Sequence, residues 1–150
     1  MAQHTVAVYV ENDTGEIISD LHYLHRYDSD IYEPGTLPIL DVGKLNIIGK
    51  ATYWTGFGRT GYDYWWVQFI RGGVRYACKA NFYCYLTSDD ADGRVVLKLL
   101  KDQMQVIPLK SNSCTVSLYQ ESALLSLIAE ERSKSEPVIT ESSCDCKKEK

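Results

Sequence analysis

Tyr62-Asp63-Tyr64-Trp65-Trp66-Val67-Gln68-Phe69-Ile70 is the most strongly β-prone segment of the chain. Side chains of a strand alternate between two faces, so Trp65, Val67 and Phe69 are expected to face a core. The opposite face then carries Tyr62, Tyr64, Trp66 and Gln68. In a fold of two packed layers this second face looks outward.

The same period-two pattern recurs along the chain, with turn residues at short intervals. Strands are expected over residues 5–10, 17–26, 45–54, 62–70, 74–79, 94–100, 103–109 and 113–120. Residues 94–100 also fit a short helix, and residues 27–40 are interpreted as a long surface loop because they contain Pro34 and Pro38. The sequence therefore predicts an all-β protein, an antiparallel two-sheet β-sandwich of about eight strands.

The period changes near residue 121, where Leu124, Leu127 and Ile128 fall on one face of a helix. We therefore expect a sandwich domain over residues 1–120, one C-terminal helix over 121–134 and a disordered tail over 135–150. Cys144 and Cys146 lie in that tail, where they could bind a soft metal or be oxidised.

Composition excludes several classes of protein. The 150 residues suit one domain, and a net charge of −4 without a basic stripe argues against a nucleic-acid partner. No secretion signal and no transmembrane segment is recognisable, so a cytoplasmic location is expected, with leaderless secretion left open. The five cysteines form an odd set, which favours reduced thiols.

Residues 56–61, Gly56-Phe57-Gly58-Arg59-Thr60-Gly61, match the letters of a dinucleotide-binding loop. That chemistry requires a helix directly after the loop, whereas a strand is expected here. The glycines are therefore predicted to supply positive φ in a strand connection. A weaker interpretation gives the loop amides and Arg59 a small anion pocket.

The outward aromatic residues form the candidate ligand site, because rings stack on apolar CH patches while their OH and NH groups select an orientation. A carbohydrate or a lipid headgroup fits this chemistry. The candidate residues are Trp54, Phe57, Arg59, Tyr62, Tyr64 and Trp66, with Gly56, Gly58 and Gly61 in the adjoining loop. In the competing interpretation, a loop or the C-terminal helix covers the row. No cofactor is expected.

Acidic and histidine residues give weaker candidates. Asp89, Asp90 and Asp92 suggest calcium, but an EF-hand register would place Leu99 where a bidentate Glu is needed, so a solvated turn is expected. A small enzyme with a dispersed site around His25 and Asp28 is a further alternative. His22 and His25 are expected on opposite strand faces, which prevents a shared metal site.

Four stretches carry a resemblance to a known family: Asn12-Asp13-Thr14-Gly15, His25-Arg26-Tyr27-Asp28-Ser29-Asp30, Thr55-Gly56-Phe57-Gly58-Arg59-Thr60-Gly61-Tyr62-Asp63-Tyr64-Trp65-Trp66 and Asn81-Phe82. They resemble the domain family named for its up-regulation in long-lived, insulin-receptor-defective nematodes. The resemblance implies a compact β domain without established enzymatic activity and supplies no catalytic residues. A looser likeness, in architecture only, is to aegerolysin and actinoporin-like sandwiches that bind membrane lipids.

The function expected from the sequence is therefore a non-catalytic binding module for a glycan or a lipid headgroup, connected with stress or defence. One alternative is a self-associating structural protein, a homo-oligomer in which the outward aromatics form the subunit interface. A second alternative is a membrane-active, aegerolysin-like protein.

Overall fold

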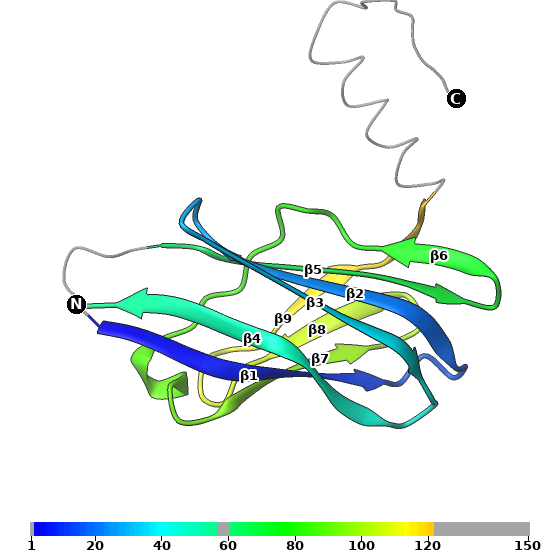
Figure 1. Ribbon diagram of the computed structural model, residues 1–150, viewed down its shortest axis with the longest axis horizontal. Helices are drawn as coiled ribbons and strands as arrows, with labels where there is room; N and C mark the ends of the chain where they lie inside the picture. Colours follow the sequence, from blue (N-terminus) through cyan, green and yellow to red (C-terminus); the bar gives the residue numbers. More distant parts are fainter. Residues whose placement is uncertain (1, 57–60, 122–150) are drawn as a thin grey trace, which may run out of the picture.

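The computed structural model describes residues 2–56 and 61–121, which form two stacked five-stranded sheets (Figure 1). Sheet A contains, in spatial order, β4 (Leu45–Thr55), β1 (Ala2–Asn12), β7 (Arg94–Leu99), β8 (Gln103–Ile107) and β9 (Cys114–Ser117). Sheet B contains β10 (Tyr119–Gln120), β6 (Val74–Ala77), β5 (Asp63–Arg71), β2 (Ile18–Tyr27) and β3 (Ile31–Leu40). A single turn of 3₁₀ helix spans Ser88–Asp90.

The expectation of about eight antiparallel strands and one helix was wrong. Residues 2–56 and 61–121 form ten strands, and β1 pairs in parallel with β7, whereas the other pairings among them are antiparallel. No α-helix occurs from residue 2 to residue 120 outside residues 57–60. Apart from Glu121, the helix expected over 121–134 and the tail over 135–150, with Cys144 and Cys146, lie outside the described residues.

Strand β3 corrects the interpretation of residues 27–40 as a loop. Residues 31–40 pair with β2 along almost their whole length, from Ile31 opposite Tyr27 to Leu40 opposite Ile18. β3 is the edge of sheet B, and no strand within the described ranges pairs with its other side, so Pro34 and Pro38 are tolerated there. Prolines exclude a central strand, but they do not exclude an edge strand.

The alternation expected for the aromatic strand is confirmed. Trp65, Val67 and Phe69 are all fully buried between the sheets. Each such side chain stabilises the fold by roughly 1.5–3 kcal/mol through removal of apolar surface from water. The segment with ambiguous period, residues 94–99, is also a strand, and its Val95, Leu97 and Leu99 are buried in the same core.

The sequence analysis expected the cysteines to be reduced, but the structure contains a disulfide. Cys84 and Cys114 form a disulfide with Cα atoms 5.9 Å apart, 30 residues apart in sequence. The count of cysteines could not reveal this pair, because the two residues meet only when the sheets stack. Cys78 is free and buried, and burial raises the pKa of its thiol to about 11.

Within residues 2–56 and 61–121, no helix has the length and apolar character that crossing a membrane requires.

Candidate ligand-binding site

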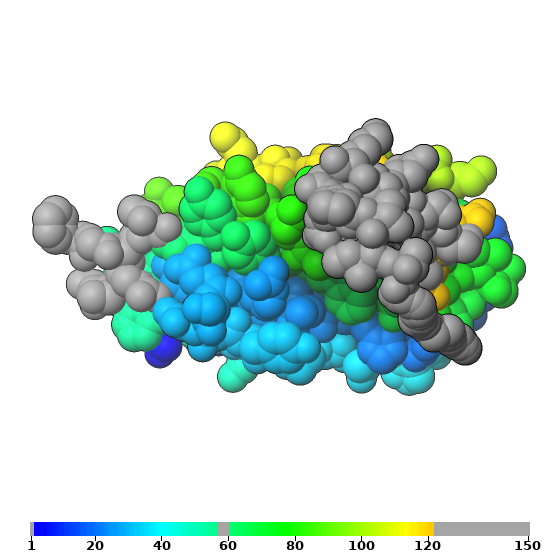
Figure 2. All heavy atoms as spheres, turned by 90° about the horizontal axis from the view of Figure 1, so that it is seen from above, coloured from blue at the N-terminus to red at the C-terminus, as the bar shows by residue number. Residues whose placement is uncertain are grey.

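Tyr62, Tyr64, Tyr83 and Tyr85 gather on the outer face of sheet B, and we call them the tyrosine cluster. The ring centroid of Tyr62 lies 4.9 Å from that of Tyr83 and 5.3 Å from that of Tyr85. Tyr62, Tyr83 and Tyr85 are 39%, 45% and 47% exposed. In Figure 2 the green surface of this part of the chain lies beside the blue surface of β2 and β3. The rings therefore form an exposed aromatic surface.

Half of this cluster comes from a segment that the sequence analysis did not recognise as extended. After β6 the chain runs back along β5, where the Trp65 N–H donates to the Phe82 carbonyl (3.0 Å) and the Cys84 N–H donates to the Asp63 carbonyl (3.0 Å). An isolated antiparallel bridge sets Tyr83 opposite Tyr64. The signal was present in the sequence: along residues 82–86, buried Phe, Cys and Leu alternate with exposed tyrosines.

A hollow of about 620 Å³ adjoins the cluster, and we call it the tyrosine hollow. Its lining residues are Trp54, Thr55, Gly56, Gly61, Tyr62, Tyr85, Leu86, Thr87 and Ser88. The structure thus brings together four of the residues that the sequence analysis selected, Trp54, Gly56, Gly61 and Tyr62. Phe57, Gly58 and Arg59 lie outside the described residues.

Tyr64 and Trp66, the other two candidates, have different surroundings. Tyr64 is half-buried at the border of the cluster, and the Arg26 guanidinium carbon lies 4.5 Å from the centre of its ring. Trp66 is half-buried and packs against the hydrophobic core. It is not part of the lining of the tyrosine hollow. The outward row is therefore divided, with Tyr62 at the hollow and Trp66 away from it.

The glycines beside the hollow serve two different purposes. Gly56 has φ of +116°, as expected for a glycine in a strand connection. Gly61 instead permits a close approach, because a Cβ there would lie 2.1 Å from the Tyr27 ring. The Tyr27 hydroxyl accepts a hydrogen bond from the Gly61 N–H (3.1 Å) and donates to the Trp54 carbonyl (3.2 Å). One buried tyrosine thus holds both sides of the hollow.

The Tyr85 hydroxyl stays protonated at neutral pH. A hydrogen bond with the Tyr62 side chain, together with partial desolvation, raises the pKa of Tyr85 to about 12. The hollow therefore presents this neutral phenol together with the hydroxyls of Thr55, Thr87 and Ser88. This is a surface of stacking faces and neutral hydrogen-bonding groups.

His25, Asp63, Glu33 and Thr52 form a separate buried group, which we call the imidazole network. His25 is fully buried, with Nε2 at 2.7 Å from Asp63 Oδ1 and Nδ1 at 3.0 Å from Glu33 Oε1. Two carboxylates on the two ring nitrogens favour the doubly protonated imidazolium. Glu33 also accepts from the Thr52 N–H at 2.7 Å and from the Thr52 hydroxyl at 2.6 Å. The network thereby joins β3 of sheet B to β4 of sheet A.

The pKa values of this network follow from its contacts. Burial acts to lower the pKa of His25, but hydrogen bonds to Asp63 and Glu33 outweigh burial and leave the pKa raised. Burial acts to raise the pKa of Glu33, but bonds from His25 and Thr52 leave it lowered. For Asp63 burial prevails, and its pKa is raised. The ring nitrogens are thus occupied by structural partners.

His25 and Asp28, the two residues named for the alternative enzyme site, have different hydrogen-bond partners. Asp28 accepts a hydrogen bond from the Tyr62 N–H at 2.8 Å and supports the start of β5. His22 lies on the opposite face of β2 and its Nε2 is 3.0 Å from Asp20 Oδ1. The separation of the two histidines onto opposite faces is therefore confirmed.

The acidic turn does not contain three equivalent carboxylates. Asp90 is buried, and its oxygens accept from the backbone N–H groups of Thr87 (2.8 Å), Lys110 (2.7 Å) and Ser111 (2.9 Å). Burial acts to raise its pKa, but these bonds and that from the Ser111 hydroxyl lower it to about 2. Asp89 and Asp92 are exposed. In the described ranges no group of three or more His, Cys, Asp or Glu side chains is placed to hold a metal ion.

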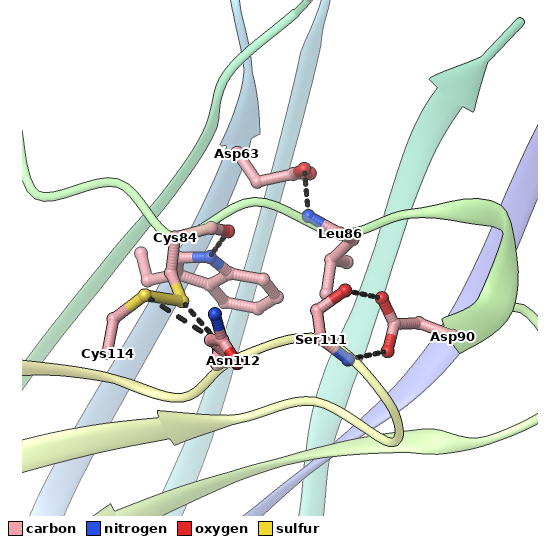
Figure 3. Close-up of a disulfide and its surroundings, with 8 residues drawn as sticks. Asp63, Cys84, Leu86, Asp90, Ser111, Asn112 and Cys114 are labelled. Atoms are coloured by element: carbon pink, nitrogen blue, oxygen red, sulfur yellow. Dashed lines mark hydrogen bonds between the residues drawn. A yellow bond between two sulfur atoms is a disulfide. The ribbon is translucent and has the colours of Figure 1, made fainter.

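The solvated turn expected here is therefore correct for Asp89 and Asp92 and wrong for Asp90. That carboxylate ties the turn at residues 87–90 to the connection between β8 and β9 (Figure 3). Its oxygens are already used by protein donors, which leaves it poorly suited to bind calcium.

The fold and the tyrosine hollow define this class of protein: a two-sheet β-sandwich with an exposed aromatic surface on one sheet. The chain belongs to the family described as "Up-Regulated in long-lived daf-2", whose model matches residues 2–143. The resemblance drawn from the sequence is thus confirmed for this family. The likeness to aegerolysins is not confirmed. A comparison with curated proteins gives no match.

Proposed function

We propose that this chain is a non-catalytic carbohydrate-binding module with its binding site in the tyrosine hollow. The observation that carries the proposal is the tyrosine cluster, three of whose rings are 39–47% exposed around a hollow of about 620 Å³. Sugar rings present CH groups on their faces and hydroxyls at their edges, so they stack on such rings and bond to the hydroxyls beside them.

The residues that line the hollow support binding over catalysis. The described lining residues are aromatic, aliphatic, glycine and hydroxyl residues, and none of them carries a carboxylate, imidazole or amine. Hydrolysis of a glycosidic bond generally requires a pair of carboxyl groups on either side of that bond. The carboxylates and the imidazole of the imidazole network are buried and bonded to one another.

The charge of the site supports a carbohydrate over an anionic lipid headgroup. A phosphate headgroup calls for a cation in the site. Among the described residues that line the hollow none carries a positive charge, and Arg26, beside the cluster, stacks on Tyr64 and donates to the Ala80 carbonyl at 3.2 Å. The family description, up-regulation in long-lived daf-2, supports placing the role in stress or defence.

A glycan array tests the proposal with the wild type and the variants Tyr62→Ala and Tyr85→Ala. We expect the wild type to bind at least one class of uncharged glycan and each variant to lose tenfold or more, which corresponds to about 1.4 kcal/mol. Tyr32→Ala is the matched control, because Tyr32 is 69% exposed but lies on β3 outside the hollow. A silent wild type on the array, with binding to phosphatidylcholine vesicles instead, would replace the carbohydrate by a lipid headgroup.

A further inference from the structure

The disulfide attaches two rings of the tyrosine cluster to the other sheet. Cys84 stands between Tyr83 and Tyr85 in the extended segment beside β5, and it is 1% exposed whereas both rings are exposed. Its partner Cys114 is the first residue of β9, in sheet A. The positions of Tyr83 and Tyr85 therefore depend on this cross-link as well as on β5.

The same segment, residues 82–86, is held to β5 by short-range pairing alone. The Cys84 N–H donates to the Asp63 carbonyl (3.0 Å), and the Leu86 N–H donates to the Asp63 carboxylate (3.2 Å). The pairing with β5 is an isolated bridge and not a continuous ladder. Such pairing opens more easily than a full strand, so the cross-link contributes strongly to the order of this segment.

One of the two sulfur atoms is accessible. A hollow of about 410 Å³ lies between residues 85–89 and residues 110–114, and Cys114 is among its lining residues. Cys114 is partly exposed, whereas Cys84 is buried. The rate of thiol–disulfide exchange depends on access to the sulfur that is attacked, so exchange should begin at Cys114.

The reduced state has a hydrogen-bond acceptor in place. The Asn112 carbonyl oxygen lies 3.7 Å from Cys84 Sγ and 3.9 Å from Cys114 Sγ (Figure 3). Each sulfur can donate to this oxygen once it carries a proton. Opening the bond therefore does not leave the buried Cys84 thiol without a polar partner, which would cost free energy.

From these observations we infer that the Cys84–Cys114 disulfide is a thiol-exchange site that controls the tyrosine hollow, with a small thiol of the glutathione type as its reductant. The thiolate attacks Cys114 Sγ, a bond forms between these two sulfurs, and Cys84 leaves as a thiolate that takes a proton from water. A second thiolate attacks the sulfur of the bound small thiol, and Cys114 leaves and is protonated in turn. Two electrons thus pass to the protein disulfide, and the two small thiols end as their own disulfide.

Reduction releases residues 82–86 from β9 and lowers the order of Tyr83 and Tyr85. The oxidised chain then binds its ligand and the reduced chain binds it more weakly. This control of binding rests on the proposed function, whereas the exchange at Cys114 stands without it.

Treatment of the folded full chain with reduced glutathione tests the exchange site. The reaction is quenched in acid, and peptide mass spectrometry locates the mixed disulfide. We expect glutathione on Cys114 in tenfold or greater excess over Cys84, and none on the buried Cys78. The variant Cys144→Ser/Cys146→Ser should give the same result. Glutathione mainly on Cys84, or a disulfide that opens only in urea, would overturn the inference.

Amide hydrogen exchange separates local release from a general loss of stability. On reduction, the protection of the Cys84 and Leu86 amides should fall at least tenfold more than that of Thr52, whose N–H bonds to Glu33 in the imidazole network. The variant Cys84→Ser/Cys114→Ser should show the same pattern without a reductant. An equal fall at all three amides would overturn the local release.

The glycan array, applied to the oxidised chain, the reduced chain and Cys84→Ser/Cys114→Ser, tests the control of binding. We expect the last two to bind fivefold or more weakly than the first, and Cys144→Ser/Cys146→Ser to bind as the wild type does. Equal binding in both redox states would overturn the control. If no glycan binds the oxidised chain, the proposed function fails and the control fails with it, while mass spectrometry still decides the exchange site.

Discussion

Two of the joints between the sheets differ in what they leave exposed. At the β3–β4 side, the imidazole network connects them through His25, Glu33 and Thr52, and its polar atoms bond to one another inside the protein. At the other joint, Cys84 with Cys114 and Asp90 with Ser111 lie behind exposed tyrosines and hydroxyls. The first joint is enclosed by the protein, whereas the second supports the exposed side chains of the candidate site.

The largest effect is expected from breaking the imidazole network. His25→Ala leaves the carboxylates of Asp63 and Glu33 without their partner, so it should cost about 3–5 kcal/mol of unfolding free energy, measured in urea. His22→Ala is the matched control, because this exposed histidine lies on the other face of the same strand; it should cost under about 0.5 kcal/mol. Equal costs for the two variants would show that the network does not hold the sheets together.

The disulfide joint should give the next largest effect. Removing a cross-link between residues 30 apart is expected to cost about 3–4 kcal/mol, because the unfolded chain regains loop entropy. The measurement is urea unfolding of wild type with and without dithiothreitol, compared with the variant Cys84→Ser/Cys114→Ser. Cys144→Ser/Cys146→Ser is the control and should respond to the reductant as wild type does. An unchanged urea midpoint after reduction would contradict the prediction.

Asp90 should contribute a smaller effect that depends on pH. Its lowered pKa, about 2 against 3.8 for the ordinary group, means that its contribution is full above pH 4 and is lost as the pH falls through 2. The loss should amount to about 2 kcal/mol. It is measured as the difference in unfolding free energy between wild type and Asp90→Asn, which should shrink from pH 5 to pH 2. A difference that stays constant with pH would mean that the carboxylate charge contributes nothing.

The smallest effect on stability is expected at the exposed cluster. Tyr83→Ala removes a ring that is 45% exposed, so it should cost under about 1 kcal/mol in urea unfolding while reducing binding on the glycan array. Phe82→Ala, one residue away and 8% exposed, is the matched control and should cost about 3–5 kcal/mol. Similar costs at the two positions would make the tyrosine cluster part of the core.

The sequence predicted what depends on local alternation. The division of β5 into a buried face with Trp65 and an outward face with Tyr62 follows directly from a period of two. The same rule applied to residues 82–86 would have found Tyr83 and Tyr85, so their omission was avoidable.

Other features depend on contacts between distant residues and could not be predicted. Glu33 lies within residues 27–40, which were interpreted as a loop because of their prolines. For this reason Glu33 was not recognised as a partner of His25. Asp90 bonds to residues about twenty positions later, which no local pattern reveals. The disulfide likewise depends on the stacking of the two sheets.

The parallel pairing of β1 with β7 has a consequence for biosynthesis. β1 occupies an interior position in sheet A, between β4 and β7, a strand that ends at Leu99. Until that residue emerges from the ribosome, one long side of β1 has unpaired backbone groups, which invite pairing with other chains. The nascent chain therefore carries an unprotected edge until β7 has been made, and contacts so distant in sequence favour slow folding.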